Sequence, residues 1–503
     1  MARSGSASVL KRAGLALSGV LVLALPAGVV WLAQAQPAPE PAAVEIPSYT
    51  VSADKTSWVC AAAPTLPTAS AGDDIAYDPE LGTGGGQLST EVRMMALGEP
   101  AAPELTFGEV GTEGAVAGTA AGLALAVATD IADPTVSVVT GSNGEVPLAG
   151  GLAVARADAG DLRGLSVSSC GQPITSAVLV GGSTSLGSST RLVLSNPGQT
   201  VATVTLTGWS GTGPLPEIAP IVVPPGQVQA LLLETISLSE RLAIRVDVAG
   251  GRVVPTLQDS SLDGLIAAGT ETIGPAADPA TEVFFSAVPL LVADEAAANL
   301  RLLNPDEQAA TVSVDLLGPD GPEALEGAQD TVIEPGSVLD ISLAGVHEGQ
   351  YGIRVSADVP VTGAVQLLRT GVAGDADPDT PPVDVAWLPA TTAVDRGVLP
   401  IPAALVDTAS VALTNAGEQT SDVTVVGYDA EGAVSGEQSV TLSAGSSAPV
   451  TVPAGTVLLE LTGQGLLASA VLTSAAADGT LISAVNITGD PFSEQQVGVR
   501  VGG

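Results

Sequence analysis

The sequence has few of the side chains on which most catalytic and metal sites depend. Its 503 residues include one histidine, two cysteines and two lysines, and aromatic residues make up 2 %. These counts exclude most zinc sites, haem ligation and thiol redox centres, which need histidine or cysteine ligands. Lysine and arginine together number 16 against 54 acidic residues. That balance excludes a basic face for nucleic acid, whose phosphates must be neutralised by cations.

The acidic excess gives a formal net charge of −38. High net charge favours disorder only when hydrophobicity is low. Here 46 % of the residues are hydrophobic, so we expect folded domains with an acidic surface that keeps them soluble. The length implies several domains. The 59 glycines and 37 prolines favour many turns and short strands over long helices.

One long apolar run occupies residues 13–33, near the N-terminus. A helix of this length spans about 30 Å, the thickness of the hydrocarbon core of a bilayer. Lys11 and Arg12 precede the run and the next basic residue is Lys55, so we expect the N-terminus in the cytoplasm and the remainder outside. The length favours an anchor. A cleaved signal peptide stays open, because Ala33-Gln34-Ala35 has the form of a cleavage site.

The two cysteines suit an exported chain. Disulfides persist in oxidising compartments, so the even pair Cys60 and Cys170 is expected to form a bridge. The bridge would join the two ends of the first module. Two unrelated buried thiols are the alternative, because free cysteine behaves as a small hydrophobic residue.

Three segments repeat at a nearly fixed period. They align on Asn196, Asn304 and Asn415, and each is followed by a second shared pattern: PIVVPPGQVQALLL, TVIEPGSVLDISL and APVTVPAGTVLLEL. A third pattern is expected to close each unit, as in ITSAVLVGG from Ile174 and LISAVNITG from Leu481. Such periodicity indicates tandem copies of one fold.

The pattern within one copy predicts an all-β fold. TVSVDLL and DVTVVGY alternate apolar and polar residues, as strands with one buried face do. Turn dipeptides such as Asn-Pro and Asp-Gly punctuate them, which is typical of a β-sandwich of about 100 residues. The recurring asparagine is interpreted as a turn former whose side chain binds the turn backbone.

We therefore predict tandem immunoglobulin-like β-sandwich modules after one N-terminal transmembrane helix or signal segment. The expected regions are a cytoplasmic stub with the transmembrane helix or signal (1–36), a Pro/Ala-rich linker (37–57), an N-terminal β-rich module (58–172) and three β-sandwiches (173–280, 281–385 and 386–503).

Four segments together resemble a known family: TSWVC, which holds Cys60; GDLRGLSVSSCGQP, around Cys170; VGGSTSLGSSTRLVLSNPG; and NPDEQAATVSV. They are similar to uncharacterised actinobacterial exported proteins known only as a domain of unknown function. The resemblance covers almost the whole chain beyond the linker. It implies an N-terminal membrane helix or signal and β-rich extracytoplasmic modules, with no established activity. Val178 and Leu179 depart from it, since such proteins often carry an aromatic before the VGG turn.

Each candidate for catalysis or metal binding is incomplete in the sequence. His347 is the only possible base of a Ser-His-Asp triad, and no GxSxG motif accompanies it. The glycine-rich stretch 82–86 lacks the ending of a phosphate-binding loop. Asp375, Asp377 and Asp379 resemble the start of a calcium loop, but Pro378 interrupts it. We predict no catalytic residue, cofactor or metal site.

The sequence thus favours a non-catalytic structural or interaction protein of the cell envelope. A binding module for envelope polysaccharide is the alternative, and an envelope enzyme ranks third. The expected partners are an envelope component, either protein or polysaccharide, and the membrane through the N-terminal helix. The expected location is the cell membrane, with a single span and an extracytoplasmic C-terminal region, or the exterior if the segment is cleaved.

Overall fold

The chain is all-β, as the sequence predicted. The computed structural model describes residues 48–52, 55–66, 87–98, 101–141, 147–291, 296–374, 377–402, 404–490 and 494–498. Over these ranges the regular structure is β-strand, with one short 3-10 helix, η1 (Leu233–Thr235). No helix in these ranges is long and apolar enough to cross a membrane. The expected membrane segment, residues 13–33, lies outside them.

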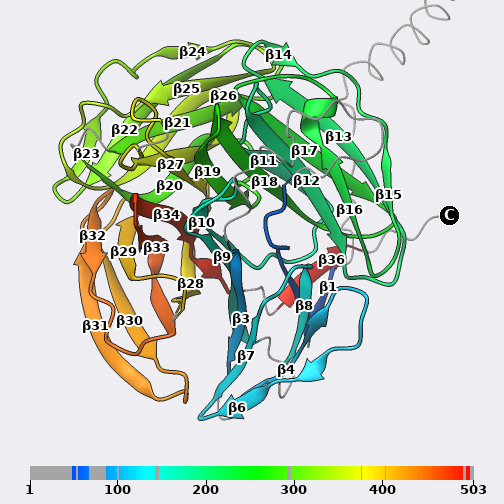
Figure 1. Cartoon of the computed structure of the whole chain (residues 1–503). Helices are drawn as coiled ribbons and strands as arrows, with labels where there is room; N and C mark the ends of the chain where they lie inside the picture. Colours follow the sequence, from blue (N-terminus) through cyan, green and yellow to red (C-terminus); the bar gives the residue numbers. More distant parts are fainter. Residues whose placement is uncertain are drawn as a thin grey trace, which may run out of the picture. The chain divides into compact units, whose positions relative to one another are not determined.

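Residues 52–495 form one compact unit. Separately, β1 (Ser48–Ser52) and β36 (Glu494–Gly498) pair as a two-stranded sheet. Within the compact unit the strands fall into four repeats (Figure 1). Repeats 1 and 2 each have two sheets, whereas the strands of repeat 3 and of repeat 4 each form one eight-stranded sheet. Repeat 1 contains β2 (Lys55–Cys60), β3 (Ser89–Leu97), β4 (Glu104–Glu109), β5 (Ala115–Val116), β6 (Gly118–Ala120), β7 (Leu123–Thr129), β8 (Thr135–Thr140), β9 (Leu148–Ala157) and β10 (Gly164–Ser169).

Repeat 2 shows the strand order most clearly. One sheet has the order β11-β17-β13-β14, with β15 also paired to β13, and the other has the order β16-β12-β18-β19. These strands are β11 (Ser176–Val180), β12 (Ser188–Asn196), β13 (Ala202–Ser210), β14 (Gly213–Pro214), β15 (Ile221–Val223), β16 (Gln227–Leu232), β17 (Leu242–Ala249), β18 (Val254–Asp263) and β19 (Ile266–Ile273).

Repeats 3 and 4 keep this order but fuse two strands into one. The long strands β26 and β33 each pair with strands of both halves of their repeat, β26 with β22 and β21 and β33 with β30 and β29, so that the two halves form one continuous sheet. Repeat 3 contains β20 (Ala280–Leu290), β21 (Ala296–Asn304), β22 (Ala310–Gly318), β23 (Gly321–Ala324), β24 (Thr331–Ile333), β25 (Ser337–Ser342), β26 (Gly349–Thr370) and β27 (Val383–Pro389). Repeat 4 contains β28 (Val394–Pro400), β29 (Thr408–Asn415), β30 (Ser421–Tyr428), β31 (Val434–Leu442), β32 (Ser447–Val450), β33 (Leu458–Ala476), β34 (Gly479–Asn486) and β35 (Thr488–Gly489).

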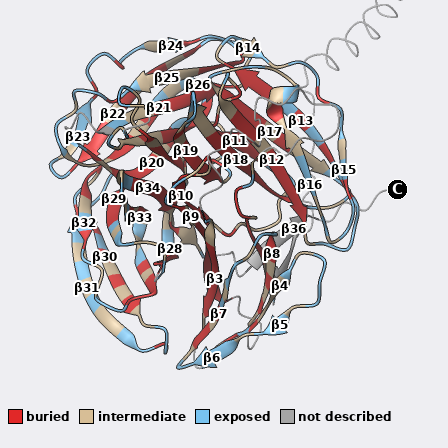
Figure 2. Ribbon diagram, in the orientation of Figure 1, coloured by how far each residue is buried: buried red, intermediate tan, exposed pale blue. Residues whose placement is uncertain are grey.

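The expectation of immunoglobulin-like sandwiches following one another along the chain is wrong. The last strands of the four repeats contact one another in a ring, β10 to β19, β19 to β27, β27 to β34 and β34 to β10, which gives the compact unit a propeller-like arrangement. Figure 2 shows these closing strands largely buried, whereas β31 is mostly exposed or half-buried. The alternation of β22 and β30 correctly predicted one buried face for each, but the closing strands bury both faces.

The ring closes between the last repeat and the first. Met95, Leu123 and Leu148 of repeat 1 share a hydrophobic cluster with Val398, Val457 and Leu458 of repeat 4. Arg163, beside β10, forms an ion pair of 2.7 Å with Asp478, in the turn between β33 and β34. Repeat 4 therefore packs on both repeat 3 and repeat 1.

Two further expectations bear on where a repeat begins and ends. The third sequence pattern does not close every repeat, because its copies in β11 and β20 open repeats whereas those in β27 and β34 close them. The expected domain boundaries remain predictions. The one near residue 385 falls inside β27.

The recurring asparagines hold the turn after β12, β21 and β29, as interpreted from the sequence. The Nδ2 of Asn304 donates to the carbonyl oxygens of Gln308 (2.8 Å) and Ile333 (3.1 Å), and its Oδ1 accepts from the N–H of Asp306 (3.0 Å). Asn196 and Asn415 make the equivalent bonds. All three side chains are buried, so each asparagine pairs backbone groups that water cannot reach.

Replacing one of these asparagines should destabilise the protein. We expect Asn304→Ala to cost about 2–4 kcal/mol, because several buried backbone groups lose their partner at once. Urea unfolding followed by intrinsic fluorescence measures the change. Gln308→Ala is the matched control, because that side chain is exposed and only its backbone takes part. Equal midpoints for the two variants would contradict the role.

Cys60 and Cys170 form a disulfide, as the sequence predicted. The bridge lies in the core of repeat 1 with Trp58 and Met94, and joins β2 to the residue after β10. It is reinforced by two hydrogen bonds of 2.8 Å between the backbones of Val59 and Gly171.

Thiol labelling tests the bridge directly. The purified, non-reduced protein, unfolded in guanidinium, should contain no reactive thiol, and two should be labelled after reduction. Two labelled thiols before reduction would show that the cysteines are free. Reduction should also lower the unfolding midpoint, because a bridge over a separation of 110 residues restricts the unfolded chain.

Candidate functional site

The ring of closing strands gathers polar side chains at its centre. The central cluster comprises Ser166 from β10, Glu271 and Thr272 from β19, Asp384 from β27 and Ser483 from β34. Each is at most 5 % exposed. Each closing strand is the edge of its sheet, paired on one side only, so its outward N–H groups need partners from another repeat. The cluster supplies several of those partners.

Asp384 pairs with two sheet edges at once. Its Oδ2 accepts the N–H of Leu165 on β10 (3.1 Å) and the N–H of Ile482 on β34 (2.7 Å). Burial raises the pKa of Asp384 to about 7, although these hydrogen bonds and the Arg163 charge oppose the shift. Its Oδ1 has no hydrogen-bond partner among the described residues. One carboxyl group thus joins repeats 1, 3 and 4.

Glu271 and Ser483 continue the same network. Glu271 accepts a hydrogen bond of 2.6 Å from the Ser483 hydroxyl and one of 2.8 Å from the N–H of Thr272. Ser483 in turn accepts from the N–H of Val167 (2.9 Å), on the edge of β10. Burial raises the pKa of Glu271 well above its usual value, and the negative charge of Asp384 adds to the shift.

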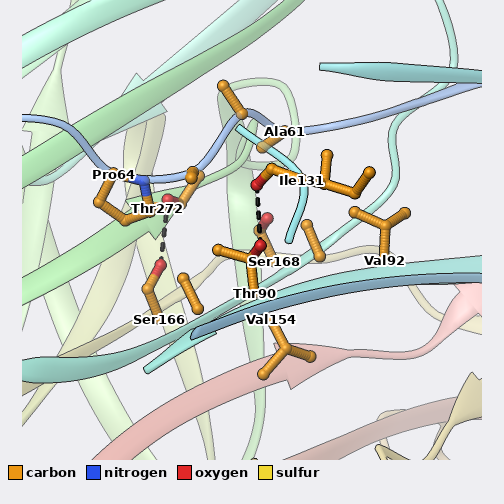
Figure 3. A pocket seen from close by; sticks show the side chains of 13 residues that line it. Ala61, Pro64, Thr90, Val92, Ile131, Val154, Ser166, Ser168 and Thr272 are labelled. Atoms are coloured by element: carbon orange, nitrogen blue, oxygen red, sulfur yellow. Dashed lines mark hydrogen bonds between the residues drawn. The ribbon is translucent and has the colours of Figure 1, made fainter. Parts of the chain in front are cut away.

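A small cavity adjoins the cluster. Figure 3 shows Ser166 and Thr272 directed toward each other, joined by a hydrogen bond of 3.0 Å between their hydroxyl oxygens. The cavity measures about 10 Å³ and is also lined by Thr90 and Ile131. That volume is about enough for one water molecule. Raised carboxyl pKa values are typical of acid catalysts, but this cavity cannot admit a substrate. The arrangement instead joins the repeats.

A second buried carboxyl lies where repeats 2 and 3 meet. Asp259 accepts hydrogen bonds from the Thr190 hydroxyl (3.0 Å) and the N–H of Ser183 (3.3 Å), and burial raises its pKa to about 6. Beside it, the guanidinium of Arg301 lies 4.8 Å from the ring centre of Trp387.

Arg301 of repeat 3 binds repeat 2 directly. Its Nη1 donates to the carbonyl of Gly182 (2.7 Å), and its Nε donates to Asp340 (2.8 Å). The guanidinium thus donates to the backbone of repeat 2, at Gly182, and to a carboxylate of its own repeat 3, at Asp340.

The residues singled out in the sequence lie elsewhere. His347 is exposed, in the segment after β25. The N–H of Asp379 donates to the Asp377 side chain (3.2 Å), while Asp375 and the glycine stretch 82–86 fall outside the described ranges. Within those ranges no group of three His, Cys, Asp or Glu residues is placed to hold a metal ion.

Sequence reasoning missed the central cluster. Its signal was an acidic residue inside an otherwise apolar strand, as in IAAGTETI and VDVAWLP.

A larger, open groove lies between repeats 1 and 2. This junction groove measures about 410 Å³, within the range of small-molecule sites. It is lined by Ser57 of β2, by the segment before β11, by the turn after β12 and by the turn between β17 and β18: Ser57, Pro173, Thr175, Pro197, Gly198, Thr200, Gly250, Gly251 and Arg252. None of these residues is acidic.

Together the fold and the cysteine bridge define an all-β protein of four repeats whose closing strands meet around a buried polar centre. The chain belongs to a family of unknown function, DUF5719, which is matched over residues 125–453. A comparison with curated proteins found no match.

Solved structures offer only distant likeness. The crystal structure of Thermotoga maritima 1070 is 19 % identical, with a TM-score of 0.17, and the match covers 22 % of this chain and 93 % of that one. A BSP domain of a biofilm associated protein is 10 % identical, with a TM-score of 0.13, and the match covers 81 % of this chain and 91 % of that one. TM-scores this low support no argument about fold or function.

The buried carboxyl groups give stability a definite pH dependence. The pKa values of about 7 for Asp384 and about 6 for Asp259 lie above the ordinary 3.8, so the folded state holds these protons more tightly than the unfolded chain. Their stabilising effect is complete below about pH 4 and is lost as the pH rises through 6 and 7. We expect the thermal midpoint, measured by circular dichroism at constant ionic strength, to fall between pH 5 and pH 8.

Asp384→Asn separates this effect from general repulsion among surface carboxylates. The amide oxygen can still accept both N–H groups, and the side chain no longer ionises. The variant should be at least as stable as the wild type at pH 8 and show a shallower pH dependence. A slope identical to that of the wild type would contradict the assignment.

Proposed function

We propose that this protein is a non-catalytic structural or interaction protein of the cell envelope. The main support for the proposal is that the buried carboxyl groups accept hydrogen bonds from neighbouring repeats and face no cavity large enough for a substrate. Glu271 and Asp384 have the raised pKa values of acid catalysts, but their hydrogen bonds join repeats and the adjoining cavity has room for about one water molecule. A four-repeat unit joined in this way suits a rigid platform for binding or spacing.

Export is part of the proposal. The disulfide suits an oxidising compartment outside the cytoplasm. The apolar run 13–33, with basic residues only before it, would act as a single-pass anchor, or as a signal if it is cleaved. The net charge of −38 disfavours nucleic acid and anionic lipid surfaces as partners, so the partner would be an envelope protein or polysaccharide.

A module that binds envelope polysaccharide is the second candidate. The junction groove favours it, because hydroxyl-bearing side chains and an arginine line an open site of suitable volume. The few aromatic residues argue against the flat stacking platforms that many sugar-binding surfaces use.

Protease accessibility tests the location. In intact cells freed of their wall, added protease should digest the region after residue 36, and that region should otherwise sediment with the envelope or appear in the medium. A cytoplasmic enzyme that stays intact is the control for leakage. Protection of the region until the membrane is lysed would overturn an extracytoplasmic role.

A further inference from the structure

Hydrogen bonds to backbone groups hold the segments that line the junction groove in place. Asn196 holds the turn at Pro197–Thr200, donating to the carbonyl of Thr200 (2.8 Å) and accepting from the N–H of Gly198 (3.0 Å). The lining segment before β11 is joined to β17 by the N–H of Val248, which donates to the carbonyl of Thr175 (2.8 Å). A site formed in advance loses less entropy when it binds a ligand.

The groove contains a cation without a partner. Each of the other arginines in the described ranges donates to a carboxylate or a carbonyl oxygen. Arg252 makes no hydrogen bond or ion pair with any residue of those ranges. Lys55, exposed and also without a partner there, lies two residues from Ser57 and so on the same face of β2. The two unpaired cations thus belong to one region.

Hydroxyl groups accompany these charges. The side chains of Ser57, Thr175 and Thr200 line the groove and make no hydrogen bond with the described residues. They can therefore donate to and accept from a ligand. Two prolines, Pro173 and Pro197, add apolar surface beside them.

Repeats 3 and 4 lack this charge pattern. In repeat 3 the turn after the asparagine carries Asp306 and Glu307, and Asp358 stands between the equivalent strand pairs of β26. In repeat 4 the corresponding turns carry Glu418 and Gln464. In a chain with 54 acidic residues, the turns of repeat 2 that line the junction groove thus carry no acid, whereas the corresponding turns of repeats 3 and 4 do.

We propose that the junction groove binds an anionic sugar, with Arg252 on its carboxylate or phosphate group and the three hydroxyl side chains on its hydroxyls. This inference rests on the second candidate function and names its ligand class. Lys55 adds attraction at the rim. A planar guanidinium with several donors suits either anionic group, and the open groove admits a residue within a longer chain.

Calorimetric titration of the full-length protein tests the site with four probes: tri-galacturonate, glucose 6-phosphate, maltotriose and inorganic phosphate. We expect one of the two charged sugars to bind, with maltotriose at least roughly ten-fold weaker. The two charged sugars distinguish a carboxylate from a phosphate. Binding should weaken as salt is raised, because the groove is open to solvent.

Variants assign the binding to the groove. Arg252→Gln should weaken it roughly ten- to a hundred-fold, and Lys55→Gln roughly two- to five-fold. Arg354→Gln is the matched control, because it removes one positive charge from repeat 3 and should leave binding unchanged. Thermal midpoints of all three variants exclude misfolding as the cause.

Three results would overturn the inference: no charged sugar binding more tightly than about 10 mM, equal affinity for Arg252→Gln and the wild type, or inorganic phosphate binding as tightly as the sugars. Each leaves the envelope role intact if added protease still reaches the region after residue 36. Protection of that region from the protease would instead contradict the envelope role, and the result of the sugar titration would be unaffected.

Discussion

The structure depends on the need to pair backbone N–H groups where sheet edges are buried. β10, β19, β27 and β34 each end a sheet, and the ring puts these edges together away from water. An unpaired N–H there would cost about 1–3 kcal/mol, so each needs an acceptor from a neighbouring repeat. Asp384 and Ser483 are such acceptors, for Leu165, Val167 and Ile482. Charged and polar side chains are therefore required at the centre of the fold, although burial raises the pKa values of their carboxyl groups.

The same bonds explain how similar repeats assemble in one order. Apolar packing alone distinguishes poorly between neighbours that all present valine, leucine and alanine. Hydrogen bonds at fixed positions do distinguish them, because a displaced register would leave buried groups unpaired. The Oδ2 of Asp384 accepts both of its backbone hydrogen bonds only when repeats 1 and 4 both adjoin repeat 3. Arg301 reaches the Gly182 carbonyl only when repeat 2 lies beside repeat 3. The disulfide joins two segments of repeat 1. It therefore stabilises that repeat and does not determine which repeats lie next to each other.

The sequence predicted what depends on local pattern. Alternation revealed the strands around TVSVDLL and DVTVVGY, turn chemistry identified Asn304, and the even cysteine count identified the bridge. The ring could not be predicted in this way, because burial of both faces of β19 and β34 depends on contacts between repeats far apart in sequence. For the same reason the third repeated pattern predicts one role for all its copies, although β11 opens its repeat and β34 closes its own. Asp384 gave a local signal, an acid within VDVAWLP, but its partners are 219 and 98 residues away.

Most of the few arginines in the described ranges lie beside an acceptor, and Arg252 is the exception. In a chain with so large an acidic excess, an arginine is most easily stabilised by a nearby carboxylate. Arg163 and Arg301 follow that rule at repeat junctions, where each joins two repeats and is almost fully buried. Arg252 lies at another junction, but the turns around it carry no acid, whereas the equivalent turns of repeats 3 and 4 do. At this junction the fold brings a cation and three hydroxyl groups together in an open groove. Arg252 has no partner within the described residues, and an anionic ligand can supply one.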